Sequence, residues 1–408
     1  MRPLLVVLHD LGSADPADIM ASAGDADVLF VCDRASPYVD AHFSELAGYA
    51  PVLDMTGAGV VDSVMALEPA GVVTFSDFQL GAAASVAAAC GLPGHSPAVA
   101  ATLTDKSAQR RAMRAAGVQA TGSVVVRHES QAAAAVAEVG LPAVVKPRHG
   151  AASVHTSLVG SVTECAGAIA DFRHARPPGV GRELVVEELL VGDPSVAGPF
   201  WGDYVSVESI VCDGDVRHVC VTGRTALAEP FRETGCFVPC TLPGPVADAV
   251  LGLATRALRA LGVQRAVTHT EIKLTAAGPR VIEVNGRMGG FVGKVLRRST
   301  GYDLLASAIR LALGEPVSAP SLRFGEVAFC CQLTAPASAS RLPVIDAGRL
   351  GRLPGVEHVD LQAGAGDPAD WRAGSLACAG HVYGAVADHG RLRRVVESLN
   401  EELLCQYA

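Results

Sequence analysis

The chain has 408 residues and a formal net charge of −9, with 50% hydrophobic, 18% charged and 5% aromatic residues. This composition excludes an intrinsically disordered chain, and the acidic balance excludes a general nucleic-acid-binding surface. The longest uncharged run, residues 78–104, is interrupted by glycine and proline and cannot form one membrane-spanning helix. We therefore expect a cytoplasmic, globular protein with no nucleic-acid or membrane partner. Its 11 scattered cysteines are expected to be reduced.

Short apolar runs alternate with Ala-rich helical runs at the start of the chain. Because the runs are continuous and of strand length, they indicate a parallel sheet covered on both faces. The expected strands are Leu4–Leu8, Val28–Cys32 and Val72–Phe75, and the expected helices include Val60–Leu67 and Leu80–Cys90. This βαβ pattern predicts a Rossmann-like domain over residues 1–103. It has no GxGxxG turn, which argues against a dinucleotide site.

The middle of the chain mixes helices with hairpins. Thr104 or Asp105 is suited to cap a helix that begins near Lys106. Strands are predicted at Val124–Val126, Ala143–Lys146, Glu183–Val191, Tyr204–Val211 and Val216–Thr222, and a helix at Val246–Leu261. After about Ser318 a smaller α/β segment follows, and it ends in a helix over Leu392–Leu404.

Two runs around residues 269–274 and 280–285 predict a hairpin whose turn centres on Ala277. Antiparallel pairing then places Glu271 opposite Glu283, with Asn285 on the same face, because side chains alternate along a strand. The opposite, core-facing side is expected to carry Ile272, Leu274, Ile282 and Val284. Two facing glutamates are destabilising unless a cation lies between them, and these oxygen donors suit Mg²⁺. The alternative is a solvated outer strand whose glutamates face water.

Four other features are unremarkable alone and informative in their order along the chain. Lys106 begins a helix, and Lys146 ends a strand; either alone is expected to be a surface lysine. The small-residue turn from Gly150 to Ser153 follows, and its amides could hold phosphate. Glu187 and Glu188 then interrupt an apolar run, which could also be a strand leaving the core.

Taken in order, Lys106, Lys146-Pro147, Glu187-Glu188, Glu271 and Glu283-Val284-Asn285 resemble the ATP-grasp superfamily, and the likeness covers nearly the whole chain. The resemblance implies an α/β fold in which a Rossmann-like domain, a two-lobed ATP-grasp domain and a small α/β domain follow one another. The implied boundaries are residues 1–103, 104–317 (lobes 104–186 and 187–317) and 318–408.

The resemblance also implies cofactors and their ligands. Lys106 and Lys146 would contact the ATP phosphates, and the loop ending at Ser153 would fold over them. The segment Glu187–Leu190, which includes Glu188, would receive adenine partly through its backbone. Glu271, Glu283 and Asn285 would hold Mg²⁺, two ions in this family, with Mn²⁺ as an alternative. Asp203 and Glu208 both remain candidates for the ribose contact, because the insertion Asp193–Gly202 obscures the alignment.

The run from Glu283 to Gly290 is similar to the carboxylate–amine ligase branch that joins amino acids. In that branch Arg287, beside Gly290, would stabilise the tetrahedral oxyanion and contact substrate; as the alternative, it is a surface arginine paired with an acid. Residues 231–239 resemble the branch's substrate segment, so Glu233 and Cys236 are implied to face substrate, although a histidine usually stands at the position of Cys236. Asp77 matches an acid that faces a substrate amino group.

The implied activity is an ADP-forming ligase that makes an amide or peptide bond between small amino-acid-like substrates. Arg287 and Lys146 would be its catalytic residues, ATP and Mg²⁺ its cofactors, and antibiotic or other secondary-metabolite synthesis its setting. The sequence does not decide the oligomeric state, and a homodimer is one option. The alternatives are a carboxylating ligase, like biotin carboxylase or purine-pathway members, and a nucleotide-binding regulatory module without turnover.

Overall fold

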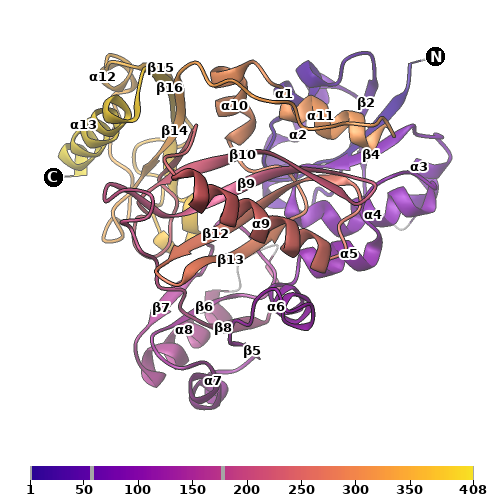
Figure 1. The fold of residues 1–408 in the computed structure, drawn as a ribbon. Helices are drawn as coiled ribbons and strands as arrows, with labels where there is room; N and C mark the ends of the chain where they lie inside the picture. The colour runs from indigo at the N-terminus through magenta and orange to yellow at the C-terminus, as the bar shows by residue number, and fades with distance from the viewer. Residues whose placement is uncertain (1, 56–58, 176–179, 408) are drawn as a thin grey trace.

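The computed structural model describes residues 2–55, 59–175 and 180–407. The described residues up to 103, called the N-terminal segment below, form a parallel four-stranded sheet in the order β3-β2-β1-β4. Its strands are β1 (Leu4–Leu8), β2 (Asp27–Cys32), β3 (Val52–Asp54) and β4 (Gly71–Thr74). Helices α1 (Pro16–Ser22), α2 (Pro37–Tyr49), α3 (Val60–Met65), α4 (Leu80–Ala89) and α5 (Pro97–Leu103) accompany them. The sequence-based expectation of a Rossmann-like arrangement is confirmed (Figure 1).

Helix α6 (Lys106–Ala115) leads into a separate lobe. Asp105 caps this helix through its side chain, so of the two expected caps the second is used. The lobe's sheet is antiparallel, in the order β5-β8-β6-β7, and has its own small hydrophobic core. Its elements are β5 (Ser123–Val126), η2 (Glu129–Gln131), α7 (Ala132–Val139), β6 (Ala143–Pro147), β7 (Ser157–Val159), α8 (Val162–Ala175) and β8 (Leu184–Glu188).

An eight-stranded sheet spans the rest of the chain in the order β13-β12-β9-β10-β11-β14-β16-β15. Its strands are β9 (Trp201–Cys212), β10 (Asp215–Thr225), β11 (Gly235–Val238), β12 (Ala266–Thr275), β13 (Gly278–Asn285), β14 (Val327–Thr334), β15 (Val356–Leu361) and β16 (Cys378–Val386). The helices of this part of the chain are α9 (Gly244–Ala260), α10 (Val292–Thr300), α11 (Leu304–Ala312), α12 (Ala347–Leu350), η3 (Trp371–Leu376) and α13 (His389–Tyr407). The N-terminal segment also contains the 3₁₀ helix η1 (Asp77–Gln79).

The C-terminal strands are not a sheet of their own. β14 pairs with β11, so β14, β16 and β15 extend the sheet that begins with the β12–β13 hairpin. The buried face under α9 and α13 is one continuous hydrophobic cluster across the expected boundary at residue 318. Figure 1 shows α9 across the front of this sheet, with the lobe of β5–β8 at the bottom and the N-terminal segment to one side.

Candidate active site

A cavity of about 990 Å³ lies where the N-terminal segment, the β5–β8 lobe and the large sheet meet. Nearly all the residues expected from sequence to form the site line it. These are Asp77, Lys106, Lys146, Ser153, Glu187, Glu188, Leu190, Glu233, Glu271, Glu283, Arg287 and Gly290. Asn285, which lies opposite His269 in the β12–β13 ladder, and Cys236 are not part of the lining, and neither are the two ribose candidates, Asp203 and Glu208.

The β12–β13 hairpin pairs Glu271 with Glu283, as the sequence predicts. A bulge between this pair and the turn shifts the register, so that Ile272 pairs with Val281. The expectation that Ile282 faces the core is therefore wrong, because the extra residue of a bulge turns its neighbours to the other face. Val281 is in the core, and Ile282 lines the cavity beside Glu283.

Glu271 lies beside a buried acid–base pair. His269 Nδ1 is 2.5 Å from Glu208 Oε1, and His269 Nε2 is 3.6 Å from Glu271 Oε1. Burial alone would raise the pKa of Glu271, but His269 and Arg224 outweigh it and lower the pKa to about 2. Glu271 is therefore ionised at neutral pH. Glu208 is fully buried and also accepts from the Gly289 amide, which leaves it no access to a ribose.

The residues at this hairpin fit a divalent cation only in part. Glu271 and Glu283 supply two facing carboxylates, the hard oxygen donors that Mg²⁺ prefers. Within the described ranges, no group of three or more His, Cys, Asp or Glu side chains is arranged to hold a metal ion. Apart from Asn285, the expected third ligand, the remaining ligands of an ion here would have to come from outside the protein, as phosphate oxygens do.

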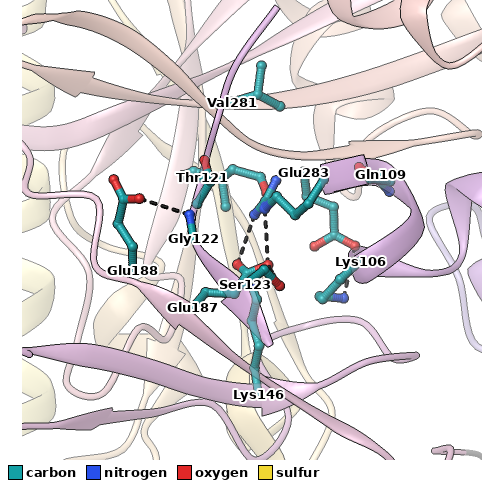
Figure 2. Close-up of polar contacts among 12 residues, drawn as sticks. Lys106, Gln109, Thr121, Gly122, Ser123, Lys146, Glu187, Glu188, Val281 and Glu283 are labelled. Carbon is teal, nitrogen blue, oxygen red and sulfur yellow. Dashed lines mark hydrogen bonds and ion pairs between the residues drawn. The ribbon is translucent and has the colours of Figure 1, made fainter. Parts of the chain in front are cut away.

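Lys106 joins the first turn of α6 to both the small-residue turn and the hairpin. Its Nζ donates to the Gly150 carbonyl at 2.8 Å and to Glu283 Oε1 at 3.0 Å. Its ammonium is thus held beside one of the facing carboxylates, as Figure 2 shows. The expectation of a plain surface lysine is wrong, since Lys106 is 8% exposed.

Glu187 lies at the centre of a buried ion cluster. Arg110 donates from Nε and Nη2 to the two carboxylate oxygens at 3.0 and 2.9 Å, and Lys146 Nζ is 2.8 Å from Oε2. Burial would raise the pKa of Glu187, but Arg110 and Lys146 lower it to about 2. Burial also lowers the pKa of Lys146, and the nearby charges of Arg110 and Lys106 act in the same direction. Figure 2 shows Lys146 and Glu187 end to end.

The expected adenine segment leaves its strand earlier than predicted. β8 ends at Glu188, where the sequence suggested continuation to Val191, and Leu190 lines the cavity outside the strand. Glu188 accepts from the Gly122 amide at 2.9 Å, as Figure 2 shows. It also accepts from Arg280 at 3.3 Å. Protein groups thus bind the carboxylates of both Glu187 and Glu188. A ligand at this segment would therefore contact the backbone after β8.

Two arginine–carboxylate pairs line the other end of the cavity. Arg287 Nη2 lies 2.5 Å from Asp77 Oδ2. The two residues are 210 positions apart, and the sequence analysis predicted each of them as a site residue without predicting their contact. Arg224 Nη1 donates to Glu233 Oε1 at 3.0 Å, and its Nε is buried without a partner within the described residues. Arg224 was missed from sequence, although a charged residue directly after residues 219–223 of β10, a run without charges, is a signal that could have found it.

Two other expectations concern side chains behind the lining. Cys236 is 2% exposed, lies opposite Cys330 between β11 and β14, and has its pKa raised to about 12 by burial. Its thiol is therefore neutral and packed within the sheet. Asp203, the second ribose candidate, pairs with Lys273 at 2.6 Å; Lys273 lines the cavity and Asp203 does not.

Comparison with known proteins places this architecture. The chain superposes on the L-amino acid ligase of Bacillus licheniformis with a TM-score of 0.77 at 18% identity, covering 98% of each chain. It is also 32% identical over 198 residues to carnosine synthase 1 of Gallus gallus, which covers 46% of this chain and 20% of that protein. The chain therefore has the fold of the L-amino acid ligase.

Alanine–anticapsin ligase of Bacillus subtilis (strain 168) is a further relative of this chain. The two are 28% identical over 224 residues, 51% of this chain and 47% of the relative. The match thus spans less than half the length of either named relative. No family model matches the chain. Among the described helices, none combines the length and apolar character that crossing a membrane requires.

Proposed function

We propose that this protein is an ATP-dependent carboxylate–amine ligase, which joins small amino-acid-like substrates through an amide or peptide bond and releases ADP and phosphate. One observation supports the proposal above the others. A single cavity holds the two lysines, the facing pair Glu271 and Glu283, and Arg287 with its carboxylate partner. The names of the relatives, carnosine synthase and alanine–anticapsin ligase, agree with a reaction of this class.

In the proposed arrangement ATP lies between the two lobes. The backbone after Glu188 receives the adenine, and the phosphates lie near the Nζ atoms of Lys106 and Lys146. Mg²⁺, when bound to Glu271 and Glu283, and in the proposal to Asn285, would neutralise charge on the phosphoryl oxygens. Lys146 can turn toward a phosphate at little cost, because Arg110 still holds both oxygens of Glu187.

The reaction would proceed in two transfers. A substrate carboxylate oxygen attacks the γ-phosphorus of ATP, and the bond from that phosphorus to the β–γ bridging oxygen breaks. The products of this step are ADP and an acyl phosphate. A neutral amine then attacks the acyl carbon, the tetrahedral intermediate expels phosphate, and the nitrogen loses a proton. Burial lowers the pKa of Arg287, but Asp77 and the two hairpin glutamates outweigh it and raise the pKa, so the guanidinium stays charged. In the proposal it donates to the oxyanion.

Asp77 and Glu233 would hold the amino groups of the substrates. Each already accepts from a guanidinium, so an ammonium group can take a place beside an existing carboxylate–arginine pair. The turn from Gly150 to Ser153 would cover the acyl phosphate, which water would otherwise hydrolyse. In this proposal the partners are small molecules. A homodimer is a separate proposal, and a measurement of the molecular mass in solution tests it.

The test is a screen of amino-acid pairs with ATP and Mg²⁺, in which ADP, AMP and phosphate are quantified and products are identified by mass. We expect ADP and phosphate in equal amounts, with an amide product for at least one pair. AMP and pyrophosphate would overturn the mechanism. ADP formation that depends on bicarbonate and ignores amino acids would favour a carboxylating ligase, and tight ATP binding without any ADP would favour a regulatory module.

A further inference from the structure

The 3₁₀ helix η3 (Trp371–Leu376), far along the chain, contacts the small-residue turn beside the lysines. The Ser375 amide donates to the Ala152 carbonyl at 2.8 Å, and the His155 amide donates to the Arg372 carbonyl at 2.8 Å. Gly374 has φ 64°, and a Cβ there would lie 2.1 Å from the Ala152 oxygen. Only glycine therefore permits this close approach of the two backbones.

The turn itself adopts a conformation that needs support. Ala152, Ser153 and His155 have φ values of 55°, 56° and 47°, which are unfavourable for residues that carry a Cβ. A segment of three such residues persists only where its surroundings hold it. The two backbone hydrogen bonds from η3 are such a constraint, so the position of η3 and the shape of the turn depend on each other.

Ser375 also reaches the substrate end of the cavity. Its Oγ accepts from the Glu233 amide at 2.9 Å, while Thr334 Oγ1 donates to the Glu233 carbonyl at 3.1 Å. Glu233 is the residue whose carboxylate pairs with Arg224 at 3.0 Å. Ser375 is 9% exposed and lines the cavity. One buried residue thus joins the turn through its backbone and Glu233 through its side chain.

We propose that Ser375 is a positioning residue that couples closure of the turn over nucleotide to placement of Glu233 at the substrate end. The inference rests on the proposed function, because it assigns the turn to ATP and Glu233 to substrate. When the turn settles on the nucleotide, its bond to the Ser375 amide fixes η3, and the Ser375 hydroxyl then fixes the Glu233 backbone. An acyl phosphate therefore forms only when the amine end of the site is in place.

Hydrogen exchange with a non-hydrolysable ATP analogue and Mg²⁺ tests the coupling without knowledge of the substrates. In the wild-type protein we expect the analogue to slow exchange in residues 150–156 and also in residues 231–235. In Ser375→Ala the first effect should persist, whereas exchange at the Glu233 amide should be about tenfold faster than in wild type, as expected for one lost hydrogen bond. Ser375→Thr, which keeps the hydroxyl, should restore the wild-type pattern.

Turnover gives a second readout, and Ser338→Ala, at an exposed serine, is the matched control. We expect Ser375→Ala to keep its KM for ATP within about twofold, and to release about tenfold more ADP per amide formed. Gly374→Ala should instead raise the KM for ATP, because it displaces the turn.

The outcomes separate the two proposals. Equal protection of residues 231–235 in wild type and Ser375→Ala, with an unchanged ratio of ADP to amide, would refute the coupling while the ligase stands. If the analogue protects neither segment in wild type, the assignment of this cavity to ATP is refuted, and the coupling fails with it.

Discussion

Removing Arg110 should destabilise the protein far more than removing another arginine of the same helix. Arg110 is 5% exposed, donates twice to Glu187, and donates to the Ile282 carbonyl on β13 at 2.6 Å. It therefore ties α6 to the β5–β8 lobe and to the large sheet at once. In Arg110→Met, Glu187 would keep only Lys146 at 2.8 Å and Ser123 at 3.2 Å as partners.

The magnitude follows from Glu187. Its pKa lies at about 2 instead of 4.5, which corresponds to about 3 kcal/mol at about 1.36 kcal/mol per pH unit. Removing one partner of a buried ion pair costs about 3–5 kcal/mol in other proteins. We expect Arg110→Met to lower the free energy of unfolding by about 3 kcal/mol. Arg111→Met is the control: Arg111 is exposed, and within the described part of the chain its side chain donates to Ser107 of its own helix, so a loss below about 1 kcal/mol is expected.

The pH dependence supplies the decisive comparison. Because the folded-state pKa of Glu187 is lower than its unfolded value, its stabilisation is complete above about pH 4.5 and is lost as the pH falls toward 2. The difference between wild type and Arg110→Met should therefore be largest at pH 7 and shrink below pH 4.5. Urea unfolding followed by circular dichroism and by the fluorescence of buried Trp201 measures it. A loss equal to that of Arg111→Met, or one that does not change with pH, would refute this reasoning.

The site offers further tests. Glu271→Gln and Glu283→Gln should each abolish Mg²⁺-dependent ADP formation, while the circular dichroism spectrum shows that the fold is retained; normal turnover in both would contradict the metal assignment. Arg287→Ala should lower amide formation about 10²–10³-fold, with ATP affinity within a few-fold of wild type; Arg287→Lys should be nearly as poor, because it lacks the planar fork, and wild-type rates in both would leave Arg287 a structural ion-pair residue. Cys236→Ala should lower the free energy of unfolding by about 1–2 kcal/mol and leave substrate KM values unchanged. A changed KM would instead show that this thiol contacts substrate.

How far the sequence predicts the site depends on the range of the interactions. The pairing of Glu271 with Glu283 was predictable, because alternation and a short turn determine the register of a hairpin locally. The bulge at Ile282 was not, since nothing in the run of residues 280–285 marks an extra residue. The ATP-grasp resemblance placed Lys106 and Lys146, but not the side chains that they contact.

The residues that the sequence missed hold distant parts of the chain together. Arg110 meets Glu187 across 77 positions, and Ser375 meets Glu233 across 142. An arginine on an exposed-looking helix and a serine in a loop carry no local signal of such a partner. The continuation of the large sheet through β14 was unpredictable for the same reason, because strand order is decided by packing between segments rather than within them.

Four cations that line the cavity are held in ion pairs, and these pairs affect where ATP and substrate would bind in the proposed reaction. Lys106, Lys146, Arg224 and Arg287 are each paired with a carboxylate that lines the same cavity, which offsets the cost of burying these four charges. A nucleotide can replace a carboxylate partner only where that carboxylate finds another cation. Glu187 has one already in Arg110, and Glu283 would gain one from a metal ion, so the two lysines are free to exchange. Asp77 and Glu233 have no such second cation among their described ion pairs, which leaves them to an incoming ammonium group. The pairing pattern thus favours phosphates at the lysine end and amines at the arginine end.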